Sequence, residues 1–343
     1  MLAAVCTGPL FAAWGGPDPQ PRRTEALDPE LARLAVLAAD PDVAVAYGAG
    51  AVTALRQGPA AAAFSLGQQV IALLDQHSRR LPLGLLREAA DAALTSGDGP
   101  AGEALLDRAV QQAQAGDEQG SSPLDQARVL AEQGRHLIAR DPGQAGQLLE
   151  RACQLFTQAG SEGEAAAATG TLADIAYQRG DYDEALRIRR EIELPVYERL
   201  GETQSAAITW GQIADITYQR GDYDQAADLQ HKRLEANQQL GDLDGIAAAS
   251  WDLAQIYLAR QDYQSAFPRL AESFQLFSRL QRPDGIAAVG SALGQLLITA
   301  GDPGQARQVL QASLAAATTI GWADAAQHLT GLLNELPDDK DQP

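Results

Sequence analysis

Hydrophobic and small residues recur along the C-terminal two thirds of the chain with a period of about 40 residues. In each period a large apolar residue is followed by a very small one and, two positions later, by another large one. The three sets are Leu172, Ile213, Leu253 and Leu293; Ala173, Ala214, Ala254 and Gly294; and Ile175, Ile216, Ile256 and Leu296. Large residues three apart share one face of a helix, and the small residue lets a neighbouring helix approach closely. The pattern predicts an all-α protein.

Each period is predicted to hold two helices of similar length, because two sets of turn residues alternate along it. Aspartates that suit helix N-caps are separated by 40, 41, 40 and 40 residues, at Asp141, Asp181, Asp222, Asp262 and Asp302. A second set follows each aspartate by about 20 residues, at Gly160, Gly201, Gly241, Gln281 and Gly321. Glycine suits the left-handed position that ends a helix. The alternation predicts antiparallel helix pairs.

One repeat is 41 residues long instead of 40, and this irregularity predicts a local distortion of a helix. The single period of 41 residues contains its extra residue between Gly180 and Gly201, in the helix that also holds Pro195. A proline inside a helix removes one backbone hydrogen bond and kinks the helix. We therefore expect a bend or a bulge in this helix.

The charge of the chain argues against nucleic acid and membrane surfaces as partners. Its 343 residues include 26 basic and 45 acidic side chains, a formal net charge of −19, and only two lysines, Lys232 and Lys340. Proteins that bind phosphate backbones or anionic lipids use clustered basic residues, and no basic run occurs here. We expect a protein or peptide partner of neutral to basic character.

Catalytic and metal-binding motifs are not found in the sequence. No phosphate-binding loop or nucleophile elbow is readable, and the paired carboxylates recur once per repeat, as capping residues do. The histidines, His77, His136, His231 and His328, are scattered, and Cys6 and Cys153 lie far apart. We predict no enzymatic activity, no cofactor, no metal site and no disulfide framework.

The repeats resemble the tetratricopeptide family, whose pattern of large, small, aromatic and small positions is matched by Leu172, Ala173, Tyr182 and Ala185 and their counterparts. The 40-residue period is similar to the long-helix subtype of kinesin light chains. Residues 240–245 and 251–256 also look similar to repeat arms of bacterial STAND signalling proteins. The resemblance implies an α-solenoid, a right-handed superhelix of antiparallel helix pairs.

We divide the chain into five parts on this basis. Residues 1–27 form an apolar and Pro/Gly-rich segment expected to be weakly ordered, and residues 28–122 read as degenerate helical repeats. Residues 123–322 carry the tetratricopeptide-like repeats, residues 323–336 a capping helix, and residues 337–343 an acidic tail expected to be disordered. We expect a cytoplasmic protein. Secreted or periplasmic placement is the alternative if residues 1–14 act as a signal.

The resemblance also implies where a partner binds, because the first helix of each pair lines a concave groove in this family. Groove positions in this sequence are Asp174, Tyr177, Gln178, Asp215, Tyr218, Gln219, Trp251, Gln255 and Gln295. Family members that clasp a C-terminal carboxylate use Lys and Asn here, so a carboxylate clamp is not expected. A polar, mildly acidic groove with aromatic anchors suits a basic or amide-rich peptide.

Three functions remain open from the sequence. The leading hypothesis is a non-catalytic scaffold that binds a peptide or protein segment on its concave face. The second is a regulatory or sensor module of a bacterial signalling or defence system, whose ligand alters the superhelix pitch. The third is an array that associates with copies of itself.

Overall fold

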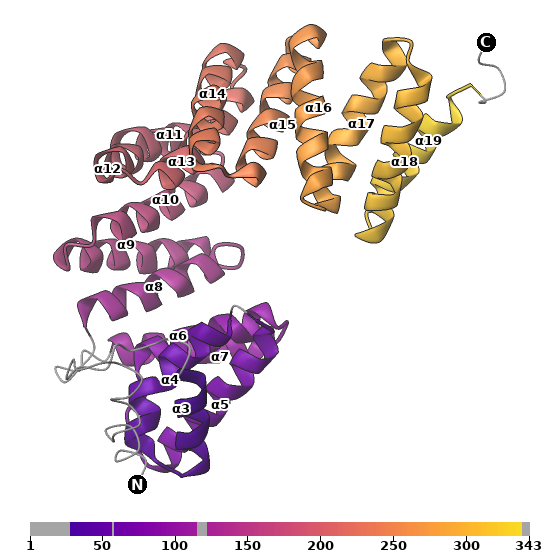
Figure 1. Cartoon of the computed structure of the whole chain (residues 1–343). Helices are drawn as coiled ribbons and strands as arrows, with labels where there is room; N and C mark the ends of the chain where they lie inside the picture. The colour runs from indigo at the N-terminus through magenta and orange to yellow at the C-terminus, as the bar shows by residue number, and fades with distance from the viewer. Residues whose placement is uncertain (1–27, 57, 115–121, 338–343) are drawn as a thin grey trace, which may run out of the picture. The chain divides into compact units, whose positions relative to one another are not determined.

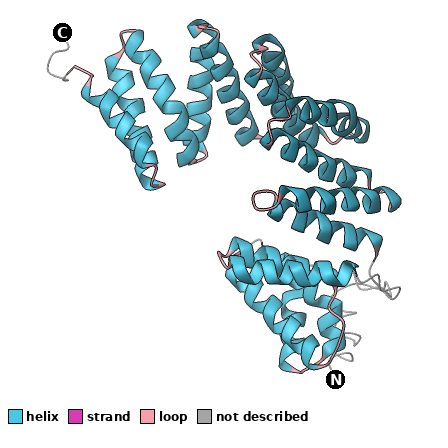
Figure 2. Ribbon diagram, turned by 180° about the vertical axis from the view of Figure 1, so that it is seen from behind, coloured by secondary structure: helices cyan, strands magenta, loops and turns pink. Residues whose placement is uncertain are grey.

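The computed structural model describes residues 28–56, 58–114 and 122–337, and these residues fold into helices joined by short turns, without a strand (Figures 1 and 2). The N-terminal helices are α3 (Asp28–Leu37), α4 (Pro41–Leu55), α5 (Ala60–Gln76), α6 (Leu83–Thr95), α7 (Gly99–Gln114), α8 (Pro123–Leu137) and α9 (Pro142–Gln158). The others are α10 (Glu162–Gln178), α11 (Tyr182–Ile188), η2 (Arg189–Glu193), α12 (Leu194–Leu200), α13 (Thr203–Gln219), α14 (Tyr223–Leu240), α15 (Leu243–Ala259), α16 (Tyr263–Arg279), α17 (Pro283–Thr299), α18 (Pro303–Thr319) and α19 (Ala323–Asn334). The predicted all-α class is confirmed.

Both sets of turn residues act at helix ends as expected. The carboxylates of Asp141, Asp181, Asp222, Asp262 and Asp302 each accept a hydrogen bond from the backbone N–H three residues later, at 2.9 to 3.3 Å. The predicted glycines have φ angles between 69° and 73°, in the left-handed region, at Gly160, Gly201, Gly241 and Gly321. Gln281 takes the same conformation with φ 55°. Local sequence therefore defines where these helices begin and end.

The 41-residue period contains the expected bulge, in the form of a π-helical segment. The segment, η2, spans Arg189–Glu193 and ends two residues before Pro195, which lies in the first turn of α12. A π-helical turn accommodates an additional residue in the helix, and Pro195 has no N–H to donate to the preceding turn. Arg189 and Glu193, both buried, form an ion pair of 2.8 Å within this segment.

The chain divides into two compact units within α10, residues 1–175 and residues 176–343. In the first unit, consecutive helices from α3 to α9 pack against one another, and α4, α6 and α8 also contact each other in order. Leucine and alanine side chains fill its core, including the fully buried Leu74, Leu86 and Leu149. No helix among the described residues is long and apolar enough to cross a bilayer.

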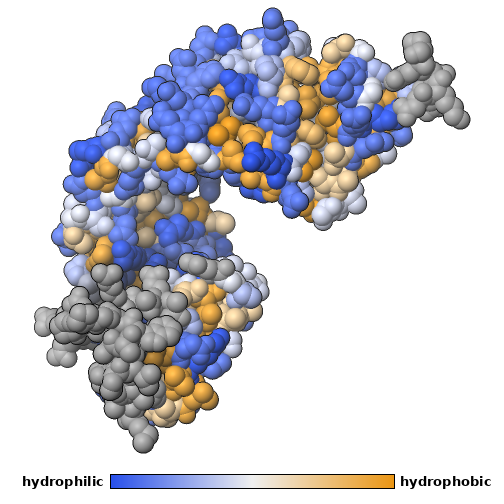
Figure 3. Space-filling model, in the orientation of Figure 1, coloured by the Kyte–Doolittle hydropathy of each residue, from blue (hydrophilic) through white to orange (hydrophobic). Residues whose placement is uncertain are grey.

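In the second unit, α13 to α18 form three successive antiparallel pairs, each packed on the next, and α19 packs on the last pair. The small positions predicted to lie at helix crossings, Ala214, Ala254 and Gly294, are buried, and a Cβ on Gly294 would lie 2.5 Å from Leu310. Leu329 of α19 is fully buried against the last pair. On the face drawn in Figure 3, hydrophilic side chains predominate over α14, whereas apolar side chains are interspersed over α16 to α18.

Candidate functional site

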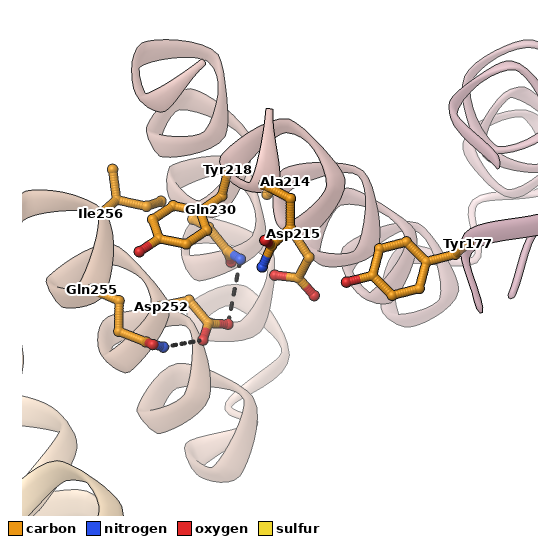
Figure 4. A pocket seen from close by; sticks show the side chains of 9 residues that line it. Tyr177, Ala214, Asp215, Tyr218, Gln230, Asp252, Gln255 and Ile256 are labelled. Atoms are coloured by element: carbon orange, nitrogen blue, oxygen red, sulfur yellow. Dashed lines mark hydrogen bonds between the residues drawn. The ribbon is translucent and has the colours of Figure 1, made fainter. Parts of the chain in front are cut away.

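A pocket of about 180 Å³ opens among the helices of the second unit. Residues from the C-terminal end of α10 and from α13, α14 and α15 line it, namely Tyr177, Ala214, Asp215, Tyr218, Gln219, Gln230, Asp252, Gln255 and Ile256 (Figure 4). The small side chain of Ala214 and the apolar side of Ile256 belong to the repeating core pattern. The other side chains are polar or aromatic, so the pocket offers hydrogen-bonding groups beside aromatic surface.

Asp252 is the better anchored of two carboxylates in this pocket. The Arg233 guanidinium lies 2.8 Å from its Oδ2, Gln230 donates to the same oxygen at 3.3 Å, and Gln255 donates to Oδ1 at 3.4 Å. Burial raises the pKa of Asp252, while Arg233 and the two amides act in the opposite direction. Arg233 passes over Gly211 of α13, where a Cβ would lie 3.0 Å from its Nη1. The charge of Asp252 is thus matched within the protein.

Asp215, on α13, has no such partner. Its carboxyl group makes no hydrogen bond or ion pair with another residue in the described part of the chain. Asp215 is an exposed residue, but its carboxyl group faces the pocket, where neighbouring side chains remove part of its hydration. This loss of hydration, together with the negative charge of Asp252, raises the pKa of Asp215 to about 6, although Arg233 and Arg189 act against the rise. The pocket therefore holds one unmatched carboxyl group.

Two tyrosines frame this carboxyl group. The hydroxyl group of Tyr177 points toward Asp215, and the ring of Tyr218 lies on the other side of the pocket (Figure 4). Each ring also packs against a second tyrosine at the start of the next helix, with centroids 5.3 Å apart, in the pairs Tyr177–Tyr182 and Tyr218–Tyr223. These aromatic contacts hold the rings in place, so their faces are preorganised.

The pocket brings together five of the nine residues that the sequence singled out, Tyr177, Asp215, Tyr218, Gln219 and Gln255. The remaining four do not line it. Asp174 and Gln178 face elsewhere on α10, Trp251 packs partly against the core of the last repeats, and exposed Gln295 hydrogen-bonds with His328 at 3.1 Å.

Sequence reasoning missed Gln230, Asp252 and Arg233. Gln230 and Arg233 belong to the second helix of a pair, outside the expected groove rows, and Asp252 lies one position beside the row that was chosen. The sequence did contain a signal for Asp252, because it is an acidic residue at a position where the other repeats have the uncharged residues Thr171, Gln212 and Ala292. Within the described residues, no three His, Cys, Asp or Glu side chains are grouped to hold a metal ion.

Comparisons with known proteins place this geometry in a family context. A tetratricopeptide-repeat family model matches residues 205–279 and 245–319, and a model of the soluble NSF attachment protein, SNAP, matches residues 94–237. No curated protein matches the chain.

Solved structures resemble the chain over most of its length. BtubC (BKLC) from P. vanneervenii is 19% identical with a TM-score of 0.51, over 76% of this chain and 93% of that one. A Rap protein complexed with competence and sporulation factor is 10% identical with a TM-score of 0.57, over 91% and 97%. Yeast Tom70 is 15% identical with a TM-score of 0.59, over 90% and 58%.

At these identities the structural likeness establishes a common fold. The family model supplies the sequence relationship over the regular repeats, where the capping aspartates, turn glycines and small crossing residues all occupy their expected places. Residues 205–319 carry tetratricopeptide repeats, within a chain whose described residues are helical.

Proposed function

We propose that this protein is a non-catalytic interaction scaffold that binds a peptide segment along the first helices of its repeats. The pocket at Asp215 receives one cationic side chain of that segment. The observation that carries the proposal is the difference between the two aspartates, since Asp252 is matched by Arg233 and Asp215 has no partner among the described residues.

The charge arrangement favours a ligand that carries its own positive group. A guanidinium or ammonium group at Asp215 would supply the opposite charge that the protein itself does not provide there. Gln219 and Gln255 add amide oxygens that can accept hydrogen bonds from the same group. The overall charge of −19 attracts a basic segment at long range as well.

The dimensions and the aromatic lining suit a single long side chain. A pocket of about 180 Å³ has room for one arginine or lysine side chain, but not for a folded element. The methylene groups of such a side chain can lie along the rings of Tyr177 and Tyr218, with the charged head toward Asp215.

The solved structures support an interaction role at the level of the fold. The Rap structure contains a bound competence and sporulation factor, so a chain with a similar helical arrangement binds such a factor. The second hypothesis, a sensor whose ligand alters the repeat pitch, is compatible with this similarity and stays a prediction. Self-association also stays a prediction.

A binding titration tests the proposal. The probe is a fluorescein-labelled, blocked arginine-rich peptide, and the readout is fluorescence anisotropy at pH 7.5. We expect Asp215→Asn to weaken binding by about tenfold, because the change removes the carboxylate that opposes the bound cation. Tyr177→Ala with Tyr218→Ala should also weaken it, by loss of apolar contact.

Asp228→Asn is the matched control. Asp228 is an exposed residue of α14 outside the pocket, so its change removes the same charge from the chain without touching the site. Binding by this variant should stay within about twofold of the parent. Equal weakening by both variants would show that net charge alone attracts the peptide, and the pocket would then not be the binding site.

A further inference from the structure

A second pocket, of about 100 Å³, lies in the first unit and has the opposite character. Arginines from two helices surround it, Arg87 on α6 and Arg128 and Arg135 on α8. The other lining residues are Ala131, Phe156, Glu164, Ala167 and Ala168. Among the lining side chains, three guanidinium groups accompany one carboxylate, in a chain whose net charge is −19.

The floor of this second pocket is apolar and rigid. Ala131, Phe156 and Ala168 are almost completely buried and belong to the core of the first unit. Arg128 forms one wall, because its Nε and Nη2 donate to the two oxygens of Glu164 at 2.7 and 3.2 Å. This two-bond contact fixes α8 against the start of α10.

The glutamates that pair with the other two arginines are less exposed than the arginines themselves. Arg87 contacts Glu88 at 2.5 Å, and Arg135 pairs with Glu132 of its own helix. The side chains of Glu88 and Glu132 are only 7% and 15% exposed, whereas those of Arg87 and Arg135 are 31% and 47% exposed. Glu88 and Glu132 thus lie behind Arg87 and Arg135, and the carboxylate that lines the pocket, Glu164, is bound by Arg128.

Each guanidinium group has five N–H donors, and the contacts above use one each in Arg87 and Arg135. Planar guanidinium groups match the two oxygens of a carboxylate, and a volume of about 100 Å³ accommodates one such group with a short stem on the apolar floor. We propose that this pocket binds an acidic side chain, Asp or Glu, of a partner peptide. It lies in a different unit from the pocket at Asp215 and does not depend on that site.

The probe for this site is a fluorescein-labelled, blocked glutamate-rich peptide, titrated at about 0.15 M salt so that long-range repulsion by the acidic chain is screened. We expect the parent to bind it, and Arg87→Gln with Arg135→Gln to weaken binding by about tenfold. Circular dichroism shows whether this double variant keeps its helices. Arg135→Gln alone, the change at the more exposed arginine, provides a second variant that should weaken binding in the same direction.

The double variant Arg140→Gln with Arg151→Gln is the charge-matched control. Both arginines are exposed residues of the same unit that do not line the pocket, and Arg140 pairs with Glu103 at 2.7 Å. Binding by this control should match the parent. The proposal is overturned if the parent does not bind the peptide, if the control weakens binding equally, or if an equal concentration of inorganic phosphate displaces the peptide. The last result would assign the pocket to the inorganic anion.

Discussion

Two aspartates in one pocket, Asp215 on α13 and Asp252 on α15, show how strongly the surroundings of a residue decide its charge pairing. Asp215 and Asp252 have the same side chain and line the same pocket, but Arg233 lies 2.8 Å from one of them only. The arginine reaches Asp252 across Gly211, so a residue without a side chain helps to decide which carboxylate is matched. The unmatched carboxylate has the chemistry that the proposed function needs.

The raised pKa of Asp215 predicts that the proposed peptide binding at this pocket depends on pH. The carboxyl group is mostly ionised above its pKa of about 6 and mostly protonated below it, whereas an arginine-rich peptide stays positively charged. Binding should therefore weaken as pH falls from about 7.5 to about 5. Anisotropy titrations at several pH values measure this, and Asp215→Asn should lose the dependence. An unchanged pH profile in that variant would assign the dependence to another group.

The same raised pKa has the opposite effect on the folded state without ligand. Because the fold disfavours the ionised form, the penalty is absent below the unfolded value of about 4 and complete above about 6. Asp215→Asn should accordingly raise the midpoint of chemical unfolding at pH 8 more than at pH 4.

At the scale of the helix pairs, local sequence defines where each helix begins and ends. Ion pairs near these helix ends then connect one repeat to the next. Arg260, in the turn after α15, pairs at 2.7 Å with Asp224 in the first turn of α14, and Arg220 pairs with Asp183 in the same way. Each of these contacts joins consecutive helix pairs, with modest energy because the groups are exposed.

A substitution at one turn tests the helix-end interpretation. Gln261 has φ 59°, where the equivalent turns carry Gly180, Gly221 and Gly301. A side chain in this conformation costs roughly 1 to 2 kcal/mol, and glycine loses some entropy on folding, so Gln261→Gly should stabilise the protein by about 0.5 to 1 kcal/mol. Urea unfolding measures the change.

Gln264→Gly, three residues later and inside α16, is the control with the same chemistry. It should destabilise the protein by up to about 1 kcal/mol, because glycine is unfavourable within a helix. If both substitutions change stability in the same direction, the conformation at Gln261 is not the cause.

At the scale of the whole molecule, the core is distributed along the repeats. Each helix packs mainly on its sequence neighbours, and the apolar residues of the second unit form two clusters, one around α14 and α15 and one from α15 to α19. In such an arrangement, stability is approximately a sum of repeat and nearest-neighbour terms. A defect at one end should therefore stay near that end.

Leu329→Ala tests this distribution. Leu329 is fully buried between α19 and the last pair, so its truncation should cost about 2 to 5 kcal/mol of local stability. Hydrogen exchange measured by mass spectrometry should become faster in α17 to α19 and stay unchanged in α8 and α9. Thr330→Ala, at the exposed neighbouring position, should change neither the local stability nor the exchange rates. Equally faster exchange in every helix would contradict independent repeats.

The sequence by itself determined the helices of this protein, because capping aspartates, turn glycines and the large and small residues between them act over a few positions. It also placed the 41-residue irregularity in the helix that contains η2. The buried ion pair of Arg189 and Glu193 in this segment was not predicted from the sequence. Residues 1–27 and 338–343, whose roles were predicted from composition, lie outside the described residues.

Only the tertiary structure decided which polar side chains share a pocket. The repeat register identified Asp215 and Gln255 as equivalent positions, but it also chose Gln295, which lies beyond the pocket. Asp252, Gln230 and Arg233 come together because α14 and α15 pack side by side, and Arg87 meets Arg128 across α6 and α8 in the same manner. Contacts between helices depend on packing angles and side-chain reach, which a one-dimensional repeat does not encode.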